Sequence, residues 1–181
     1  EVPAAGEAYY HALIVAKAER ATGGLEALRG GSFAFVEPNS TSGYLVPLLH
    51  FIDDLATRPE TYFGEVRYAG SHQAVLLQVR LGHVDAGATN DLDLRRAMEA
   101  GHIKAGELAT LWTSAPIPGS PIVVRKDLDP ALLETIRGAI LGYSDPAGLL
   151  AMQVRGFVPV DDATYAPVRR LEALRDESAA K

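Results

Sequence analysis

Short apolar runs alternate with longer segments of mixed polarity up to about residue 114. An apolar run of four to eight residues bounded by turn residues is typical of a buried strand, and a longer mixed segment is typical of a helix. Strands are expected at residues 10–16, 32–36, 66–69, 84–88, 109–114 and 122–124. The alternation predicts an α/β fold with a mostly parallel sheet and helices on both of its faces.

Helical patterns fill the spaces between these strands and dominate the last third of the chain. Helices are expected at residues 44–56, 72–81, 91–100, 129–143, 145–154 and 161–176. Several of them carry terminal signals. Asp91 or Asp93 can cap the third helix, which Gly101 closes. Pro130 occupies the first position of the fourth helix, directly after Asp129.

The segment before the first of these helices is rich in hydroxyl side chains. It contains Ser40, Thr41, Ser42 and Gly43 between a strand and a helix start. A helix N-terminus offers free N–H groups and a partial positive charge, and both suit an oxyanion. Hydroxyl groups add donors without a permanent charge, so the anion can leave again. Ordinary N-capping is the alternative, and the residues alone leave both interpretations open.

A second turn, Gly70-Ser71-His72, also precedes a helical segment. In open parallel sheets, ligands bind beyond the carboxyl ends of the strands, where the helix N-termini gather. His72 could donate to an anion there, although alone it is more typical of a surface residue in a first helical turn. The remaining histidines show no mutual metal-ligand spacing, and no metal or cofactor is expected; they are His11, His50, His83 and His102.

Composition narrows the possible classes of function. The 181 residues are 48% hydrophobic, which is enough for a packed core of one domain or two small ones. The net charge of −6 argues against a nucleic-acid partner. The absence of cysteine excludes disulfides, thiolate zinc sites and cysteine nucleophiles. No segment has the apolar length of a membrane span or the pattern of a signal peptide.

A hydrolytic triad of Ser42, His72 and Asp85 is a further combination that the residue types allow. However, the Gly-x-Ser-x-Gly motif is missing, since Ser40 stands where its first glycine would be. A phosphate-binding P-loop is also missing, because no Gly-Lys-Ser/Thr sequence follows a glycine-rich turn. Asp85 lies in an apolar strand, where a carboxylate is expected to hold a neighbouring turn. The chain is therefore not expected to be an enzyme.

Several motifs, taken together, resemble the periplasmic phosphate/phosphite/phosphonate-binding proteins of ABC importers. The Ser-Thr-Ser-Gly and Ile-Pro-Gly-x-Pro elements are the most specific of these motifs. The matching segments follow the family's order at residues 9–15, 38–47, 70–72, 84–86, 112–114, 117–123, 156–157 and 161–169.

The resemblance implies a type II periplasmic-binding fold, with two α/β lobes and a ligand cleft between them. In that family the Ser-Thr-Ser turn and its glycine grip the phosphorus oxyanion, which carries over to Ser40, Thr41, Ser42 and Gly43. The histidine of the Gly-Ser-His turn also reaches the oxyanion, which carries over to His72. The tyrosine that opens the first matching strand lines the pocket, which carries over to Tyr9.

The resemblance also implies a division into lobes. Residues 1–16 would form a crossover strand from lobe 1, and residues 17–113 would form the oxyanion-binding lobe 2. Residues 114–181 would supply the return crossover and the C-terminal helical part of lobe 1. The family has a further domain-half before Tyr9, so the first lobe is expected to be incomplete in this sequence.

Two positions depart from relatives that bind aminoalkylphosphonates. Those relatives carry acidic residues at positions that correspond here to Leu92 and Ser120. Without these carboxylates an ammonium tail lacks partners, although Asp91 or Asp93 could substitute if the turn shifts. The sequence therefore favours phosphite, methylphosphonate or phosphate as the ligand.

The predicted function is that of the solute-binding component of an ABC importer, which delivers a small phosphorus oxyanion to a membrane permease. By the same resemblance, its location would be periplasmic or extracytoplasmic. Two alternatives stay open. One is a ligand-sensing domain of a signalling protein with the same fold, and the other is a serine hydrolase that uses Ser42 and His72.

Overall fold

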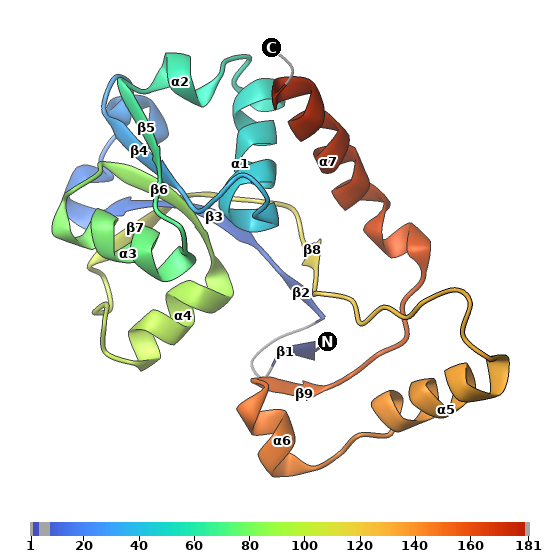
Figure 1. Ribbon diagram of the computed structural model, residues 1–181. Helices are drawn as coiled ribbons and strands as arrows, with labels where there is room; N and C mark the ends of the chain where they lie inside the picture. Colours follow the sequence, from blue (N-terminus) through green and yellow to red (C-terminus); the bar gives the residue numbers. More distant parts are fainter. Residues whose placement is uncertain (1, 4–7, 180–181) are drawn as a thin grey trace. The chain divides into compact units, whose positions relative to one another are not determined.

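The computed structural model describes residues 2–3 and 8–179 (Figure 1). The chain forms two compact units. Unit 1 comprises residues 1–10 and 118–166, and unit 2 comprises residues 11–117 and 167–181. No helix in the described part of the chain is long and apolar enough to cross a membrane.

Unit 2 is built on a five-stranded sheet with the order β5-β4-β6-β3-β7. Its strands are β3 (Ala12–Lys17), β4 (Ser32–Phe35), β5 (Glu65–Tyr68), β6 (Ala86–Asn90) and β7 (Leu108–Thr113). β4 pairs in parallel with β5 and β6, whereas β3 runs antiparallel to β6 and β7. Four strands therefore share one direction, as expected for an α/β fold. β3 is reversed relative to both of its neighbours, β6 and β7.

Helices and helical turns connect these strands, and a C-terminal helix packs beside them. They are η1 (Ala18–Arg20), η2 (Leu25–Leu28), η3 (Thr41–Leu45), α1 (Val46–Leu49), η4 (His50–Asp54), α2 (Pro59–Tyr62), α3 (His72–Leu81), α4 (Asp91–Glu99) and α7 (Ala166–Ala179). The single helix expected at 44–56 is instead a short α-helix between two π-helical turns, η3 and η4. Pro47, near the start of α1, contributes no N–H to the regular bonding pattern.

Two hydrophobic clusters cover the two faces of this sheet. Residues alternate between the clusters along β3, where Ile14 belongs to one and Val15 to the other. The same alternation holds for Phe33 and Ala34 in β4, as the two-residue period of a strand requires. α1, η3, η4 and Leu171 of α7 pack on the first face, and α3 and Ala97 of α4 pack on the second (Figure 1).

Unit 1 contains less regular structure. Its helices are α5 (Pro130–Leu141), α6 (Pro146–Ala151) and the short turn η5 (Asp162–Tyr165), and β1 (Val2–Pro3) pairs antiparallel with β9 (Val154–Gly156). β2 (Tyr9–Tyr10) pairs with β8 (Ile117–Pro118). The strand expected at 122–124 is absent, and its three side chains are exposed. These three residues are β-branched and favour an extended chain, but in the described part of the chain no strand pairs with them.

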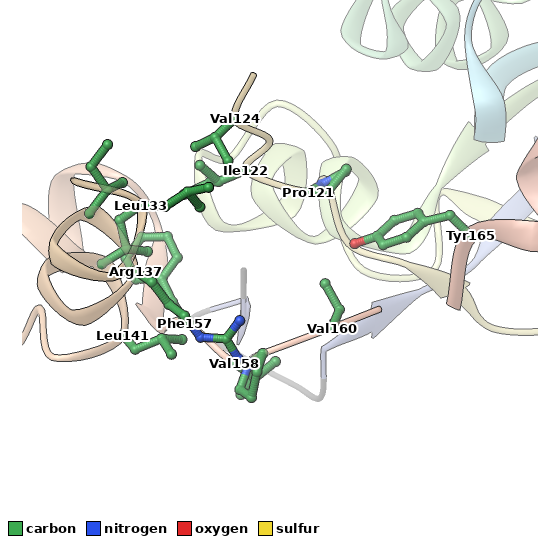
Figure 2. Close-up of a pocket in the computed structure, with 13 residues that line it drawn as sticks. Pro121, Ile122, Val124, Leu133, Arg137, Leu141, Phe157, Val158, Val160 and Tyr165 are labelled. Carbon is green, nitrogen blue, oxygen red and sulfur yellow. The ribbon is translucent and has the colours of Figure 1, made fainter. Parts of the chain in front are cut away.

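Some of the apolar side chains in the described residues of unit 1 line an open hollow. The hollow has a volume of about 180 Å³ and is lined by α5, by the extended residues 121–124 and by residues 157–160 (Figure 2). Leu133 and Leu141 of α5, Ile122 and Phe157 lie around it.

The bounds of the two units differ from those expected for the two lobes. The first residues of β3 belong to unit 2, because β3 pairs along its length with β6 and β7. α7 also belongs to unit 2 beyond its first residue, since Leu171 packs in a core cluster there. The assignment of residues 1–16, 17–113 and 114–181 to lobes stays a prediction.

Candidate oxyanion-binding site

Three helix starts gather at one edge of the sheet in unit 2. The parallel neighbours β5, β4 and β6 all end at this edge. Each leads into a helical segment, which begins at Thr41 after β4, at His72 after β5 and at Asp91 after β6. The sequence predicted the first two starts at this edge, and the third adds a further set of N-terminal N–H groups.

Ser40 is the N-cap of the first of these segments. Its Oγ accepts a hydrogen bond from the Gly43 amide at 3.0 Å, and its carbonyl accepts one from the Leu45 amide at 3.0 Å. The Ser40 hydroxyl therefore caps this segment and keeps its own hydrogen for a ligand, so its place in the oxyanion site stays a prediction. The amides of Thr41 and Ser42 follow this cap in the first turn, where backbone N–H groups have no partner within the helix and can face an anion.

Gly43 is required by close packing. It is buried, and its carbonyl accepts a hydrogen bond from the Val36 amide at 3.0 Å. A Cβ atom at this position would lie 2.6 Å from Cβ of Val36. Only glycine lets the turn fold back tightly onto the end of β4, and this contact fixes where Thr41 and Ser42 lie.

Asn90 joins the three helix starts in one hydrogen-bonded cluster. Its Nδ2 lies 3.4 Å from Oγ of Ser42 and 3.2 Å from Nε2 of His72. Nδ1 of His72 lies 3.3 Å from Oγ1 of Thr89, which is fully buried. The structure thus brings together Ser42 and His72, two residues that the sequence predicted for one site.

The role of Asn90 was missed by the sequence analysis, which assigned the cap of the third helix to Asp91 or Asp93. The cap is Asn90, whose Oδ1 accepts from the Asp93 amide at 2.7 Å. Its Nδ2 also donates to Oδ2 of Asp93 at 2.8 Å. The available signal was an asparagine at the end of an apolar strand, directly before a helical pattern.

Burial controls the ionisation of His72. It lowers the pKa of His72 below its usual value of 6.5, while the charges of Asp93 and Glu37 oppose this effect. The imidazole is therefore neutral at neutral pH. A neutral imidazole has one donor nitrogen and one acceptor nitrogen, so its tautomer decides what it offers to a ligand.

The other predicted positions lie elsewhere. Tyr9 belongs to unit 1 and is 46% exposed, so its contribution to a pocket stays a prediction. Ser120 is also in unit 1 and is exposed. The side chain of Asp91 is engaged elsewhere, since its Oδ1 accepts a hydrogen bond from the amide of His11 at 3.0 Å. Asp93 is therefore the acidic residue that contacts the cluster.

Asp85 does not complete a triad. Its Oδ2 accepts from the amide of Ser32 at 2.7 Å, and its Oδ1 pairs with Arg20. The expected structural role of this carboxylate is confirmed. It precedes the first residue of β6, whereas His72 contacts Thr89 and Asn90 at the last residues of that strand.

Metal ligation is also not indicated by the described side chains. Among the residues that the structure describes, no group of three or more histidine, aspartate or glutamate side chains could hold a metal ion. The cluster consists of neutral donors, one imidazole and the carboxylate of Asp93. This composition suits the recognition of a small polar ligand by hydrogen bonds.

Two curated relatives match most of this chain. A phosphate-import protein, PhnD, of Mycolicibacterium smegmatis is 28% identical over 170 residues, which cover 82% of this chain and 52% of that protein. A phosphonates-binding periplasmic protein of Escherichia coli is 29% identical over 154 residues, which cover 83% of this chain and 45% of that protein. The chain thus spans about half the length of these relatives.

Solved structures and the family description agree with these matches. The binding-protein component of an ABC phosphonate transporter from Pseudomonas aeruginosa is 29% identical, with a TM-score of 0.80, over 97% of this chain and 60% of that one. The type II periplasmic-binding fold is therefore confirmed. Residues 1–165 match the family described as "ABC transporter, phosphonate, periplasmic substrate-binding protein". The chain belongs to this family of periplasmic substrate-binding proteins of ABC phosphonate transporters.

Proposed function

We propose that this chain carries the oxyanion-binding site of the solute-binding component of an ABC importer. The ligand is a small phosphorus oxyanion, held by the amides of Thr41 and Ser42, the Ser42 hydroxyl and His72. The protein works outside the cytoplasm and delivers the ligand to a membrane permease. Membership of the family supports this function, and family members act as binding proteins rather than enzymes.

One observation carries the proposal. Three helix starts meet at the carboxyl edge of three adjacent parallel strands, and Ser42, His72 and Asn90 form one hydrogen-bonded cluster there. Preorganised donors at helix N-termini stabilise an anion without a lysine or arginine in the site. Such a site can bind its ligand reversibly, as transport requires.

The choice of ligand depends on the acidic groups near the cluster. Leu92 and Ser120 stand where carboxylates would hold an ammonium tail, which favours phosphite, methylphosphonate or phosphate. Asp93, however, lies beside Asn90 and places a carboxylate next to the cluster. Aminoethylphosphonate is therefore the most informative ligand to compare with the other three, because only its ammonium tail would be attracted by the negative charge of Asp93.

Isothermal titration calorimetry of the 181-residue chain with these four ligands tests the proposal. We expect binding of at least one of the three uncharged-tail oxyanions, and weaker binding of aminoethylphosphonate. If none of the four binds, the proposed function is wrong. If aminoethylphosphonate binds most tightly, the site stands and the preference inferred from Leu92 and Ser120 is wrong.

The Ser42→Ala variant tests the assignment of the site. Ser42 is buried in the first turn of η3, so loss of its hydroxyl should weaken oxyanion binding by about 1–3 kcal/mol. Ser144→Ala removes an exposed hydroxyl from unit 1 and is the control. An unchanged affinity of Ser42→Ala would remove this residue from the site.

A further inference from the structure

The amide group of Asn90 can have only one orientation. Its Oδ1 accepts from the Asp93 amide at 2.7 Å, which requires an oxygen at that position. Its other atom lies 2.8 Å from a carboxylate oxygen of Asp93, which requires a donor. The nitrogen is therefore the atom that faces His72 and Ser42. Asn90 is only 5% exposed, so water does not compete freely for these bonds.

This orientation decides the tautomer of His72. Nε2 of His72 lies 3.2 Å from Nδ2 of Asn90, which can only donate, so Nε2 must accept. Nδ1 then carries the proton and donates to Oγ1 of Thr89 at 3.3 Å. The neutral state is favoured by burial. In the ligand-free protein, His72 therefore presents a lone pair at Nε2 rather than an N–H group.

We propose that Asn90 is a positioning residue that holds neutral His72 as the Nδ1–H tautomer, and that the oxyanion binds together with one proton, shared between a ligand oxygen and Nε2. This inference rests on the proposed oxyanion site. The bound ligand then carries one proton. Either the oxyanion binds already protonated, such as a hydrogen phosphonate, or a dianion binds and one proton is taken from solvent.

Electrostatics at the cluster require this proton. A dianion facing the lone pair of Nε2 would be repelled, whereas a ligand hydroxyl can donate to it. The charged groups that act on the imidazole are Asp93 and Glu37, and both are acidic. Both therefore favour an added proton and disfavour added negative charge.

A proton on Nε2 of His72 would break the hydrogen bond from Nδ2 of Asn90, and the cluster offers that amide hydrogen another acceptor. Nδ2 of Asn90 has two hydrogens but three acceptors within 3.4 Å, namely Ser42, His72 and Asp93. When the ligand's proton occupies Nε2, the amide hydrogen can move to Oγ of Ser42. The exchange leaves Asn90 satisfied and needs no movement of the backbone.

Nitrogen-15 NMR of the histidine rings in the ligand-free 181-residue chain tests the tautomer directly. The resonances of His72 are identified by their loss in His72→Gln. At neutral pH we expect Nδ1 to resonate as a protonated nitrogen and Nε2 as an unprotonated one. The opposite pattern, or an equal mixture, would overturn the inference without touching the proposed function.

Two variants test the role of Asn90 and Thr89. Asn90→Asp keeps a cap acceptor but turns a carboxylate towards Nε2, so the pKa of His72 should rise and Nε2 should become protonated. Gln73→Glu makes the same chemical change on the exposed side of α3, beside His72, and should leave the tautomer unchanged.

Thr89→Val keeps the side-chain volume, removes the acceptor for Nδ1–H and should produce a mixture of tautomers. An unchanged tautomer in both Asn90→Asp and Thr89→Val would refute the inference.

Proton linkage tests the bound state. Calorimetry with methylphosphonate at mildly alkaline pH, in buffers of different ionisation enthalpy, measures the protons taken up on binding. We expect net proton uptake, which Asn90→Asp should reduce. Tight binding without uptake would refute the inference and leave the proposed function standing. If methylphosphonate does not bind, the same measurement is made with whichever of the other ligands does; binding of none of the four would refute the proposed function, while the NMR experiment would still decide the tautomer.

Discussion

The two units of this protein bury their apolar residues to very different extents. In unit 2, two hydrophobic clusters fill both faces of a five-stranded sheet, and aromatic rings such as Phe33, Phe51 and Phe63 pack against one another. In the described part of unit 1, Val154 is the one buried hydrophobic side chain. Val123 and Leu150 are 79% and 76% exposed. Unit 2 therefore has its own core, whereas the described part of unit 1 has none.

This difference explains where the candidate site lies. Ser42, His72 and Asn90 are held by helix starts on a packed sheet, and a rigid support keeps hydrogen-bonding groups in place. The hollow of unit 1 is lined by side chains from α5 and from non-helical segments rather than by helix starts on a packed sheet (Figure 2). Local stability follows buried apolar contacts, so unit 1 should open at a lower free energy than unit 2.

The largest expected effect comes from a matched pair of leucine truncations. Leu76 of α3 is 1% exposed and belongs to a core cluster of unit 2, so Leu76→Ala should lower the free energy of unfolding by about 2–5 kcal/mol. Leu150→Ala in α6 should change it by less than about 0.5 kcal/mol, because that side chain is 76% exposed. Urea denaturation measures both. Similar losses in the two variants would contradict the contrast between the units.

A matched pair of glycine substitutions should have a smaller effect and opposite signs in the two units. Gly43→Ala should destabilise unit 2 by about 1–3 kcal/mol, because the added methyl group collides with Val36. Gly138 lies within α5, and its Cβ would meet nothing within 4 Å. Gly138→Ala should therefore stabilise α5 by about 0.5–1 kcal/mol.

Thermal unfolding and amide hydrogen exchange measure these two glycine effects. Exchange in α5 should slow in Gly138→Ala, whereas exchange at the start of η3 should become faster in Gly43→Ala. A stable Gly43→Ala variant with unchanged oxyanion affinity would show that the turn can widen without loss of the site.

The smallest expected effect is a pH dependence that belongs to unit 2, since all five histidines lie there. Burial lowers the pKa of folded His72 below 6.5, so the unfolded chain binds a proton more readily than the folded one. Stability should therefore be fully present above pH 6.5 and should fall as the pH drops from that value towards the lower pKa of the folded state. His72→Gln should reduce this loss, and His83→Gln, which changes an exposed histidine, should not. An equal loss of stability in both variants would assign the effect to other groups.

Much of the secondary structure could be predicted from local patterns. The helix expected at 72–81 is α3 with the same bounds, and the strands expected at 32–36 and 109–114 are β4 and β7. These segments combine the right periodicity with clear terminal signals, such as Ser71 as the cap of α3. The turn at Ser40–Gly43 was also recognisable, because hydroxyl residues and a glycine follow an apolar strand.

Other features depended on partners that are distant in the sequence. Residues 122–124 have the composition of a strand but no strand beside them. Asn90 could be recognised as a possible cap, yet its contacts with Ser42 and His72 join segments 48 and 18 residues apart. The reversed direction of β3 likewise follows from its pairing with β6 and β7.

The sequence by itself determined the α/β class, the hydroxyl-rich helix start and the family resemblance, because each rests on residues that are close together along the chain. Only the tertiary structure decided that Ser40 is a cap, that Asp85 is structural and that Asn90 sets the tautomer of His72. These roles depend on which donor meets which acceptor across the sheet edge, and hydrogen bonds act over about 3 Å. Local sequence predicts that such groups exist, whereas the fold decides which of them meet.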